Sequence, residues 1–221
     1  MKKILLACLL SLPLHAFAVN LPQTDIKSEL SLLDNYDSNF FIDLNDEEIQ
    51  KEFEYTASFL KSQNFQVTPH HLFIIVDRGP KQLLMVVYPE TEDDWTLIKA
   101  SHVSTGKPGR KEHFKTPTGI YVYDGDILGY RALGTFNENH IRGIGLKGSR
   151  VWDFGWQTTE DWRSHTNTMK IRMEMHATDP ANLEHRIGRP DSEGCIRIPS
   201  GMNKFLDTFG ILDEKTNSFA L

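Results

Sequence analysis

The stretch Arg189-Pro190-Asp191-Ser192-Glu193-Gly194-Cys195-Ile196-Arg197 carries the strongest structural signal in this 221-residue chain. A small polar residue, a glycine and then a thiol are typical of a tight turn that exposes a nucleophile. Such a turn also directs backbone N–H groups toward the space beside the thiol. The stretch therefore predicts that Cys195 is presented as a nucleophile.

His176 lies 19 positions before Cys195, at the end of the alternating segment 170–175. Alternation of polar and apolar residues predicts a strand that delivers His176 at its end. An imidazole bonded to a thiol converts it to the reactive thiolate, and the two groups suffice for covalent acyl transfer. We therefore expect Cys195 to be the nucleophile and His176 the base, with the N–H groups of Gly194 and Cys195 stabilising an oxyanion.

Arg197, two positions after the thiol, has two interpretations. Its planar guanidinium suits a substrate carboxylate, and it equally suits an ion pair with Asp191 or Glu193. The histidines outside the pair show no spacing typical of metal ligands, and His185 reads as a solvated loop residue. No metal or other cofactor is expected.

The first 18 residues are typical of an export signal. Lys2 and Lys3 precede an apolar core at 4–14, and Ala16-Phe17-Ala18 predicts cleavage after Ala18. This apolar core is too short to span a bilayer. Leu5-Leu6-Ala7-Cys8 weakly resembles a lipoprotein cleavage box, which stays open as an alternative. We expect a periplasmic protein without stable membrane insertion.

The expected mature chain keeps one cysteine, Cys195, so it cannot form an internal disulfide in an oxidising compartment. The polar and charged neighbours of this thiol argue against a buried structural cysteine. The formal net charge of the whole chain is −6, and loss of Lys2 and Lys3 lowers it to −8. An acidic chain without a basic stripe excludes nucleic acid as the expected partner.

The rest of the chain predicts a mostly β fold behind a helical N-terminal segment. Residues 19–68 are expected to be helical, with a capping box from Asn45 to Glu48. From residue 69 onward, apolar runs predict strands at 72–76, 82–88, 95–103 and 120–123, joined in antiparallel fashion. Ser200 is expected to cap a last helix that stops at Gly210. We therefore divide the chain into residues 1–18, 19–68 and 69–221.

Residues 124–168 show no clear periodicity. Trp152, Trp156 and Trp162 there are either core residues or the lining of a groove for an extended polymer. The GxGxxG match at 143–148 has no preceding strand and no following helix pattern, so it does not predict a dinucleotide site.

The motif Ser192-x-Gly194-Cys195-Ile196-Arg197, with eighteen residues between His176 and Cys195, resembles the signature of the L,D-transpeptidase catalytic domain, or YkuD domain. The turn clusters at 104–108 and 115–119 resemble a second landmark of that family and occur in the family's order. The resemblance covers roughly residues 70 to 212. It implies a β-sandwich catalytic domain in which Cys195 is the nucleophile and His176 the base. Ser192, Gly194 and Arg197 fall on the remaining motif positions, and we expect Ser192, Glu193 and Arg197 to bind substrate.

The resemblance also implies the substrate. Members of the family attack the diamino acid of a peptidoglycan stem peptide and release its terminal D-alanine. An amine then resolves the thioester, from a second stem or a lipoprotein. Two alternatives stay open: an L,D-carboxypeptidase or amidase acting on the same stems, and a non-catalytic wall-binding module that retains the fold.

Two positions depart from the family pattern. Ala177 stands where the family usually has glycine, and Glu193 stands where it usually has histidine. A carboxylate beside a thiol raises the thiol pKa by like-charge repulsion. Glu193 either orients His176 in a Cys–His–Glu triad or turns outward, leaving a dyad whose imidazole is held by a backbone carbonyl.

Overall fold

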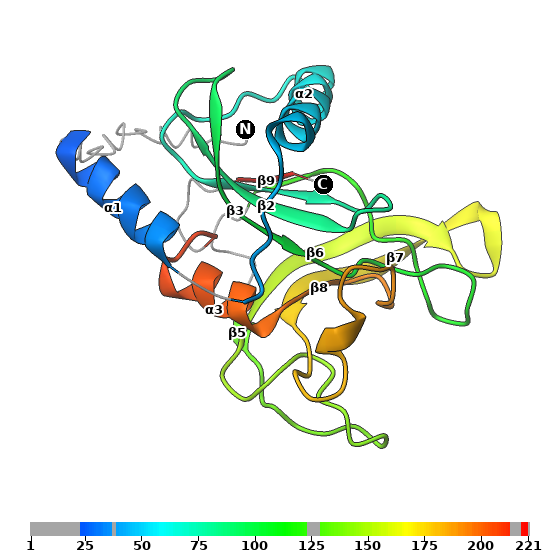
Figure 1. The fold of residues 1–221 in the computed structure, drawn as a ribbon. Coiled ribbons are helices and arrows are strands. Elements are labelled where there is room, and N and C mark those ends of the chain that lie inside the picture. Colours follow the sequence, from blue (N-terminus) through cyan, green and yellow to red (C-terminus); the bar gives the residue numbers. More distant parts are fainter. Residues whose placement is uncertain (1–22, 37–38, 123–128, 213–217, 221) are drawn as a thin grey trace, which may run out of the picture.

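The computed structural model describes residues 23–36, 39–122, 129–212 and 218–220. Within these ranges the chain forms two β-sheets with helices around them (Figure 1). The fold is mostly β, as the sequence predicts. The expected export signal, residues 1–18, lies outside the described residues.

The first sheet has five strands in the order β3-β2-β1-β9-β4. Its strands are β1 (Phe73–Asp77), β2 (Leu83–Pro89), β3 (Trp95–His102), β4 (Ile120–Val122) and β9 (Ser218–Ala220). Strands β1, β2 and β3 form the predicted antiparallel succession. The sequence did not reveal β9, which pairs in parallel with β1 and antiparallel with β4.

The second sheet has the order β5-β6-β7-β8 and is dominated by a long hairpin. Its strands are β5 (Tyr130–Arg131), β6 (Arg150–Asp161), β7 (Ser164–Ala177) and β8 (Ile196–Ile198). The expectation of an irregular segment up to residue 168 was therefore wrong. The pairing register shifts between Asp153 and Trp156, and this bulge breaks the period-two pattern that would have revealed β6.

The main core lies between the two sheets. Ile74, Val76, Leu84 and Val86 project from the first sheet, and Trp152, Phe154, Met173 and Met175 from the second. Alternate residues of β1 and β2, such as Ile75 and Met85, belong to a second core on the opposite face. The first sheet is thus buried on both faces, which explains why its strands read as continuous apolar runs.

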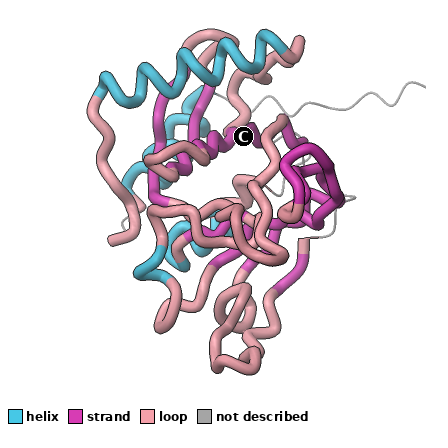
Figure 2. The backbone as a smooth tube through the Cα atoms, turned by 90° about the vertical axis from the view of Figure 1, so that its right-hand side faces the viewer, coloured by secondary structure: helices cyan, strands magenta, loops and turns pink. Residues whose placement is uncertain are grey.

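Helix α2 (Asp46–Ser62) covers that second face, with Leu60 buried against it. Its start is the predicted capping box, in which the Asn45 side chain accepts from Glu48 N–H and the Glu48 side chain accepts from Asn45 N–H. Helix α1 (Gln23–Asn35) lies at the left of Figure 1 with Leu33 in the main core, whereas α2 runs across the top of the molecule in Figure 2. Where it is described, the N-terminal segment thus contains two helices, and between them Phe41 forms a β-bridge with Ser101 of β3.

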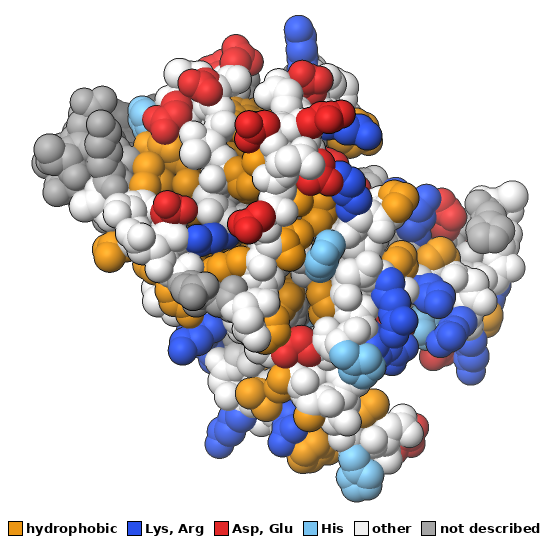
Figure 3. All heavy atoms as spheres, viewed as in Figure 1, with side chains coloured by type: hydrophobic (Ala, Val, Ile, Leu, Met, Phe, Trp, Pro, Cys, Tyr) orange, Lys and Arg blue, Asp and Glu red, His pale blue; other side chains and the backbone are white. Residues whose placement is uncertain are grey.

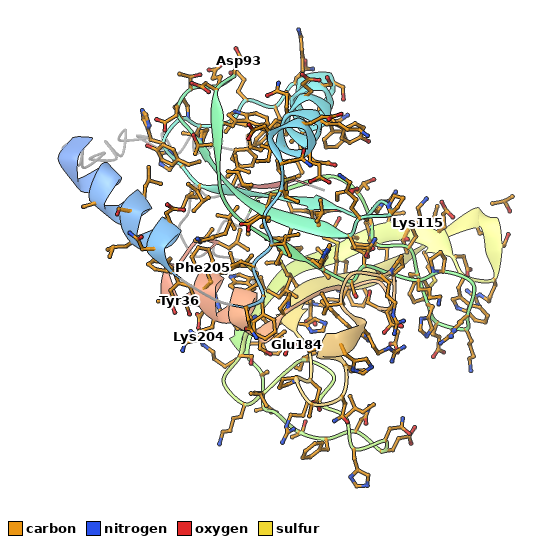
Figure 4. All side chains as sticks on the ribbon, viewed as in Figure 1. Tyr36, Asp93, Lys115, Glu184, Lys204 and Phe205 are labelled. Atoms are coloured by element: carbon orange, nitrogen blue, oxygen red, sulfur yellow. The ribbon has the colours of Figure 1, made fainter. Side chains whose placement is uncertain are left out.

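Helix α3 (Ser200–Thr208) closes one end of the main core. In Figure 4 Tyr36, just after α1, lies beside Phe205 of α3, and their ring centroids are 5.3 Å apart. The expected cap at Ser200 was wrong: the helix begins after Pro199 without a side-chain cap, and the Ser200 hydroxyl is buried without a partner. Gly210 has a φ of +61°, which suits the predicted helix stop.

Trp152 and Trp156, both on β6, do not share one surface. Trp152 is fully buried in the core, whereas Trp156 is 63% exposed. Of the two interpretations, the core one therefore holds for Trp152.

Candidate active site

Strands β7 and β8 bring the predicted residues onto one face of the second sheet. They pair in parallel, with Met175 opposite Ile196 and His176 opposite Arg197. One step earlier in this register, Cys195 stands beside Glu174. Side chains alternate along a strand, so the buried Met175 and Ile196 face the core. The side chains of Glu174, His176, Cys195 and Arg197 therefore face outward together.

These four residues line one cavity of about 640 Å³. Its walls also include the loop between β5 and β6 and the segment from β7 to β8, which lie together at the bottom of Figure 1. The principal polar residues of the lining are Arg110, His113, Glu174, His176, Arg186, Asp191, Ser192, Glu193, Cys195 and Arg197.

Ser192 holds the turn that presents the thiol. Its side chain is buried, and its hydroxyl donates to the Cys195 carbonyl (2.5 Å) and accepts from Gly194 N–H (3.1 Å). Both contacts lie inside the turn. We therefore assign Ser192 a positioning role in place of the substrate contact expected from the sequence.

Gly194 occupies a position that other residues would strain. Its φ is +132°, and a Cβ there would lie 2.7 Å from Ile171 Cδ1. Because its N–H donates to Ser192, that donor is already engaged. Of the two expected oxyanion donors, the Cys195 N–H is the one we retain.

The two landmark segments of the sequence meet at this turn. Ser104 and Arg197 exchange backbone hydrogen bonds, and Lys107 N–H donates to the Ser192 carbonyl. The Thr116 hydroxyl accepts from Gly106 N–H (2.7 Å) and donates to the Gly194 carbonyl (2.9 Å). The segments near 105 and 116 therefore form the base on which the cysteine turn is built.

Gln82 is a buried residue that no sequence motif indicated. Its Oε1 accepts from both the N–H and the hydroxyl of Thr105, and its Nε2 donates to the carbonyls of Arg78 and Gly79. This fully satisfied amide connects the β1–β2 turn to the base of the cysteine turn.

His176 is buried, and its Nδ1 lies 2.7 Å from the Ala177 carbonyl oxygen. A carbonyl can only accept, so Nδ1 carries the hydrogen and Nε2 keeps a lone pair for use as a base. Burial lowers the pKa of His176 to about 4, which keeps the imidazole neutral at physiological pH.

The Cys195 thiol is half-buried, and its Sγ lies 3.8 Å from the Arg172 carbonyl oxygen. Burial, together with smaller contributions from the charges of Glu174 and Glu193, raises the pKa of this thiol to about 11. The expectation of a resting thiolate activated by His176 therefore differs from the structure. The resting site contains a neutral thiol and a neutral imidazole, so the proton must move as the thiol attacks.

Glu193 lies outside the imidazole's hydrogen bonds. Its side chain is exposed, while the Ala177 carbonyl holds the ring of His176. The structure therefore favours the second of the two alternatives, a Cys–His pair with a backbone carbonyl as the third group. Ala177, the other departure, is accommodated by Gly145, where an added Cβ would lie 2.8 Å from that of Ala177.

Arg197 takes part in the ion pair that the sequence suggested, and it also lines the cavity. Its Nη1 donates to the Asp191 carbonyl (3.1 Å) and lies 3.5 Å from Asp191 Oδ2. Arg186 pairs with the same carboxylate at 2.5 Å. One buried carboxylate thus holds two arginines at the cavity.

Glu174 lies beside the nucleophile, although no motif in the sequence indicated it. It receives a hydrogen bond from the Tyr130 hydroxyl (3.1 Å), and burial raises the pKa of its carboxyl. The alternation of segment 170–175 placed Glu174 and His176 on one face. Only the pairing register with β8 shows that this face is the one that carries Cys195.

His185 is exposed in the short 3-10 helix η1 (Glu184–Arg186), as expected. Among the described residues, no group of three or more His, Cys, Asp or Glu side chains is arranged to hold a metal ion. None of the described helices is both long and apolar enough to cross a bilayer.

Comparison with known proteins gives the family. A model of the L,D-transpeptidase catalytic domain, YkuD, matches residues 72–216. The chain belongs to this family. The resemblance carried by the cysteine turn and the two landmark segments is thereby confirmed for well over half of the sequence.

Two solved structures of L,D-transpeptidases are similar to the chain at low identity. The one from Xylanimonas cellulosilytica DSM 15894 has 13% identity and a TM-score of 0.38, covering 76% of this chain and 69% of its own. The one from Mycobacterium smegmatis has 13% identity and a TM-score of 0.35, covering 68% and 58%. No curated protein matches the chain. These likenesses are weak, and family membership rests on the family model.

Proposed function

We propose that this protein is an exported cysteine L,D-transpeptidase that acts on peptidoglycan stem peptides. The observation that carries the proposal is the placement of Cys195, His176 and Arg197 on the same cavity face of β7 and β8. This arrangement supplies a nucleophile, a base and a carboxylate-binding group within one site. Membership of the L,D-transpeptidase family supports the choice of substrate.

In the first step, Arg197 binds a carboxylate of the donor stem and orients its scissile carbonyl. The thiol of Cys195 attacks that carbonyl while its proton passes to Nε2 of His176. The Cys195 N–H stabilises the oxyanion. His176 then protonates the nitrogen of the departing terminal D-alanine, which leaves a thioester on Cys195.

In the second step, an amine from another stem or from a lipoprotein attacks the thioester. His176, neutral again, accepts a proton from the attacking nitrogen. If water attacks instead, the enzyme is an L,D-carboxypeptidase or amidase, so the two activities share the acyl-enzyme.

Purified protein incubated with disaccharide–tetrapeptide stems tests the proposal. We expect an acyl adduct on Cys195 by intact mass and 3–3 cross-linked dimers among the products, both abolished by Cys195→Ala. Tripeptide products alone would assign hydrolysis in place of transfer. Binding of peptidoglycan without any adduct would assign a non-catalytic module.

A further inference from the structure

Glu174 places a carboxylate directly beside the nucleophile. It lies on β7 two residues before His176, so both side chains share the face that lines the cavity. Cys195 is its neighbour across the strand pair, and the two groups interact electrostatically. Arg197 of β8 follows Cys195 two positions later. The thiol therefore adjoins an anionic group on one side and a cationic group on another.

Contacts around Glu174 fix its direction without neutralising it. Tyr130, from the opposite edge strand β5, donates its hydroxyl hydrogen to Oε1, which leaves Oε2 to accept from a ligand. Arg172, the cation two residues earlier on β7, is bonded to Asp153, with Nε 2.7 Å from Oδ2. Arg172 therefore has Asp153 as its bonded partner and acts on Glu174 only through space, and the hydrogen-bond partner of Glu174 is the uncharged phenol.

This pattern fits a cationic ligand that enters during the reaction. Glu174 is half-buried. Partial burial raises the pKa of its carboxyl, and the reduced screening by water also strengthens its attraction for a cation bound beside it. The donor stem needs its carboxylate at Arg197. The group that arrives later at the thioester is an amine, which is an ammonium ion in water.

We propose that Glu174, held by Tyr130, binds the ammonium group of the acyl acceptor and thereby selects an amine over water. This inference rests on the proposed function and adds the acceptor site to it. The bound ammonium first releases one proton to solvent by way of Glu174. Its nitrogen then forms the C–N bond, the C–S bond breaks with its electron pair on sulfur, and the second proton passes through His176 to sulfur.

The test follows decay of the acyl-enzyme by intact mass. Wild type and Glu174→Gln are acylated with tetrapeptide stems and then mixed with increasing concentrations of one of two acceptors. One is a stem peptide with a free side-chain ammonium, and the other is hydroxylamine, which is uncharged at pH 8. Glu138→Gln removes the same charge from an exposed position on the neighbouring loop and serves as the control.

We expect Glu174→Gln to raise the half-saturating concentration of the stem acceptor about tenfold. This is the loss of binding expected when one partly buried ion pair is removed. Capture of the preformed acyl-enzyme by hydroxylamine should stay at the wild-type rate, and Glu138→Gln should match wild type throughout. Tyr130→Phe keeps the charge and loses the bond that directs it, so it should raise the same constant about threefold. If Glu174→Gln does not fold, Tyr130→Phe provides the test.

Equal half-saturating concentrations in wild type and Glu174→Gln would overturn the inference. Equal slowing with both acceptors would also overturn it, because a role in positioning His176 or the thioester does not distinguish a charged acceptor from a neutral one. If wild type forms no acyl-enzyme at all, the proposed function fails and takes the inference with it. The two failures are therefore distinguishable.

Discussion

At the scale of single residues, the presentation of Cys195 depends on the Ser192 hydroxyl. That one group bonds to both Gly194 and Cys195 in a buried turn. Ser192→Ala leaves a buried N–H and a buried carbonyl without this partner. We expect a loss of about 1–3 kcal/mol in the free energy of unfolding and slower acylation of Cys195.

Urea denaturation of Ser192→Ala and Ser200→Ala measures this effect. Ser200 is the matched control because its hydroxyl is buried without a partner. Its removal should leave stability unchanged or slightly raised. Equal destabilisation by the two substitutions would contradict the role assigned to Ser192.

The buried imidazole of His176 predicts a pH dependence of stability. Its pKa is about 4 in the folded protein and roughly 6.5 in an unfolded chain. Between these values the unfolded state binds the proton and the folded state does not, so acid favours unfolding. The contribution is complete above about pH 6.5 and is lost as the pH falls toward 4, by about 3 kcal/mol.

The free energy of unfolding should therefore fall more steeply in wild type than in His176→Gln between pH 6.5 and 4. Urea titrations of both proteins across this range provide the comparison. Parallel pH profiles would show that His176 is not held neutral by burial.

At the scale of elements, α2 supports the first sheet from the side opposite the main core. The cavity with Cys195 lies on the outer face of the second sheet, so α2 and the active site are separated by both sheets. Leu60→Ala should lower the free energy of unfolding by about 2–4 kcal/mol by leaving a cavity beside Phe73 and Val87.

Acylation of the folded Leu60→Ala variant should proceed at the wild-type rate, measured under conditions where the protein stays folded. Tyr55→Ala, on the exposed side of the same helix, is the control and should change neither property. A specific loss of acylation in Leu60→Ala would indicate that α2 shapes the site as well as the sheet.

At the scale of the whole molecule, charge is unevenly distributed. Acidic side chains gather at the top of Figure 3, over α2 and the β2–β3 turn, and basic ones are grouped toward the right. The α2 contribution includes Asp46, Glu47 and Glu48 at the positive end of the helix dipole. The surface seen in this view thus carries separate acidic and basic regions, although the net charge is negative.

Export is the other property of the whole molecule, and it stays a prediction. The n-region, the short apolar core and Ala16-Phe17-Ala18 predict a mature protein that begins at Val19. Expression with the native leader, fractionation and intact mass of the periplasmic product measure this directly. A product that retains residue 1, or one that begins at a lipid-modified Cys8, would contradict the predicted cleavage.

Much of the fold was predictable because several elements have local causes. The capping box at Asn45 and the apolar runs of β1 to β3 appear in the structure where the sequence placed them. Strands β6 and β9 were missed for identifiable reasons. A bulge interrupts the alternation of β6, and β9 is three residues long and depends on its pairing with β1 and β4.

The sequence by itself determined the candidate nucleophile, the candidate base and the turn between them, because short-range residue types define a turn and the end of a strand. Only the tertiary structure decided what surrounds the thiol. The parallel register of β7 and β8 places Glu174 beside Cys195, and burial makes both the thiol and the imidazole neutral. Register and burial arise from contacts between distant segments, and no local pattern along the chain encodes them.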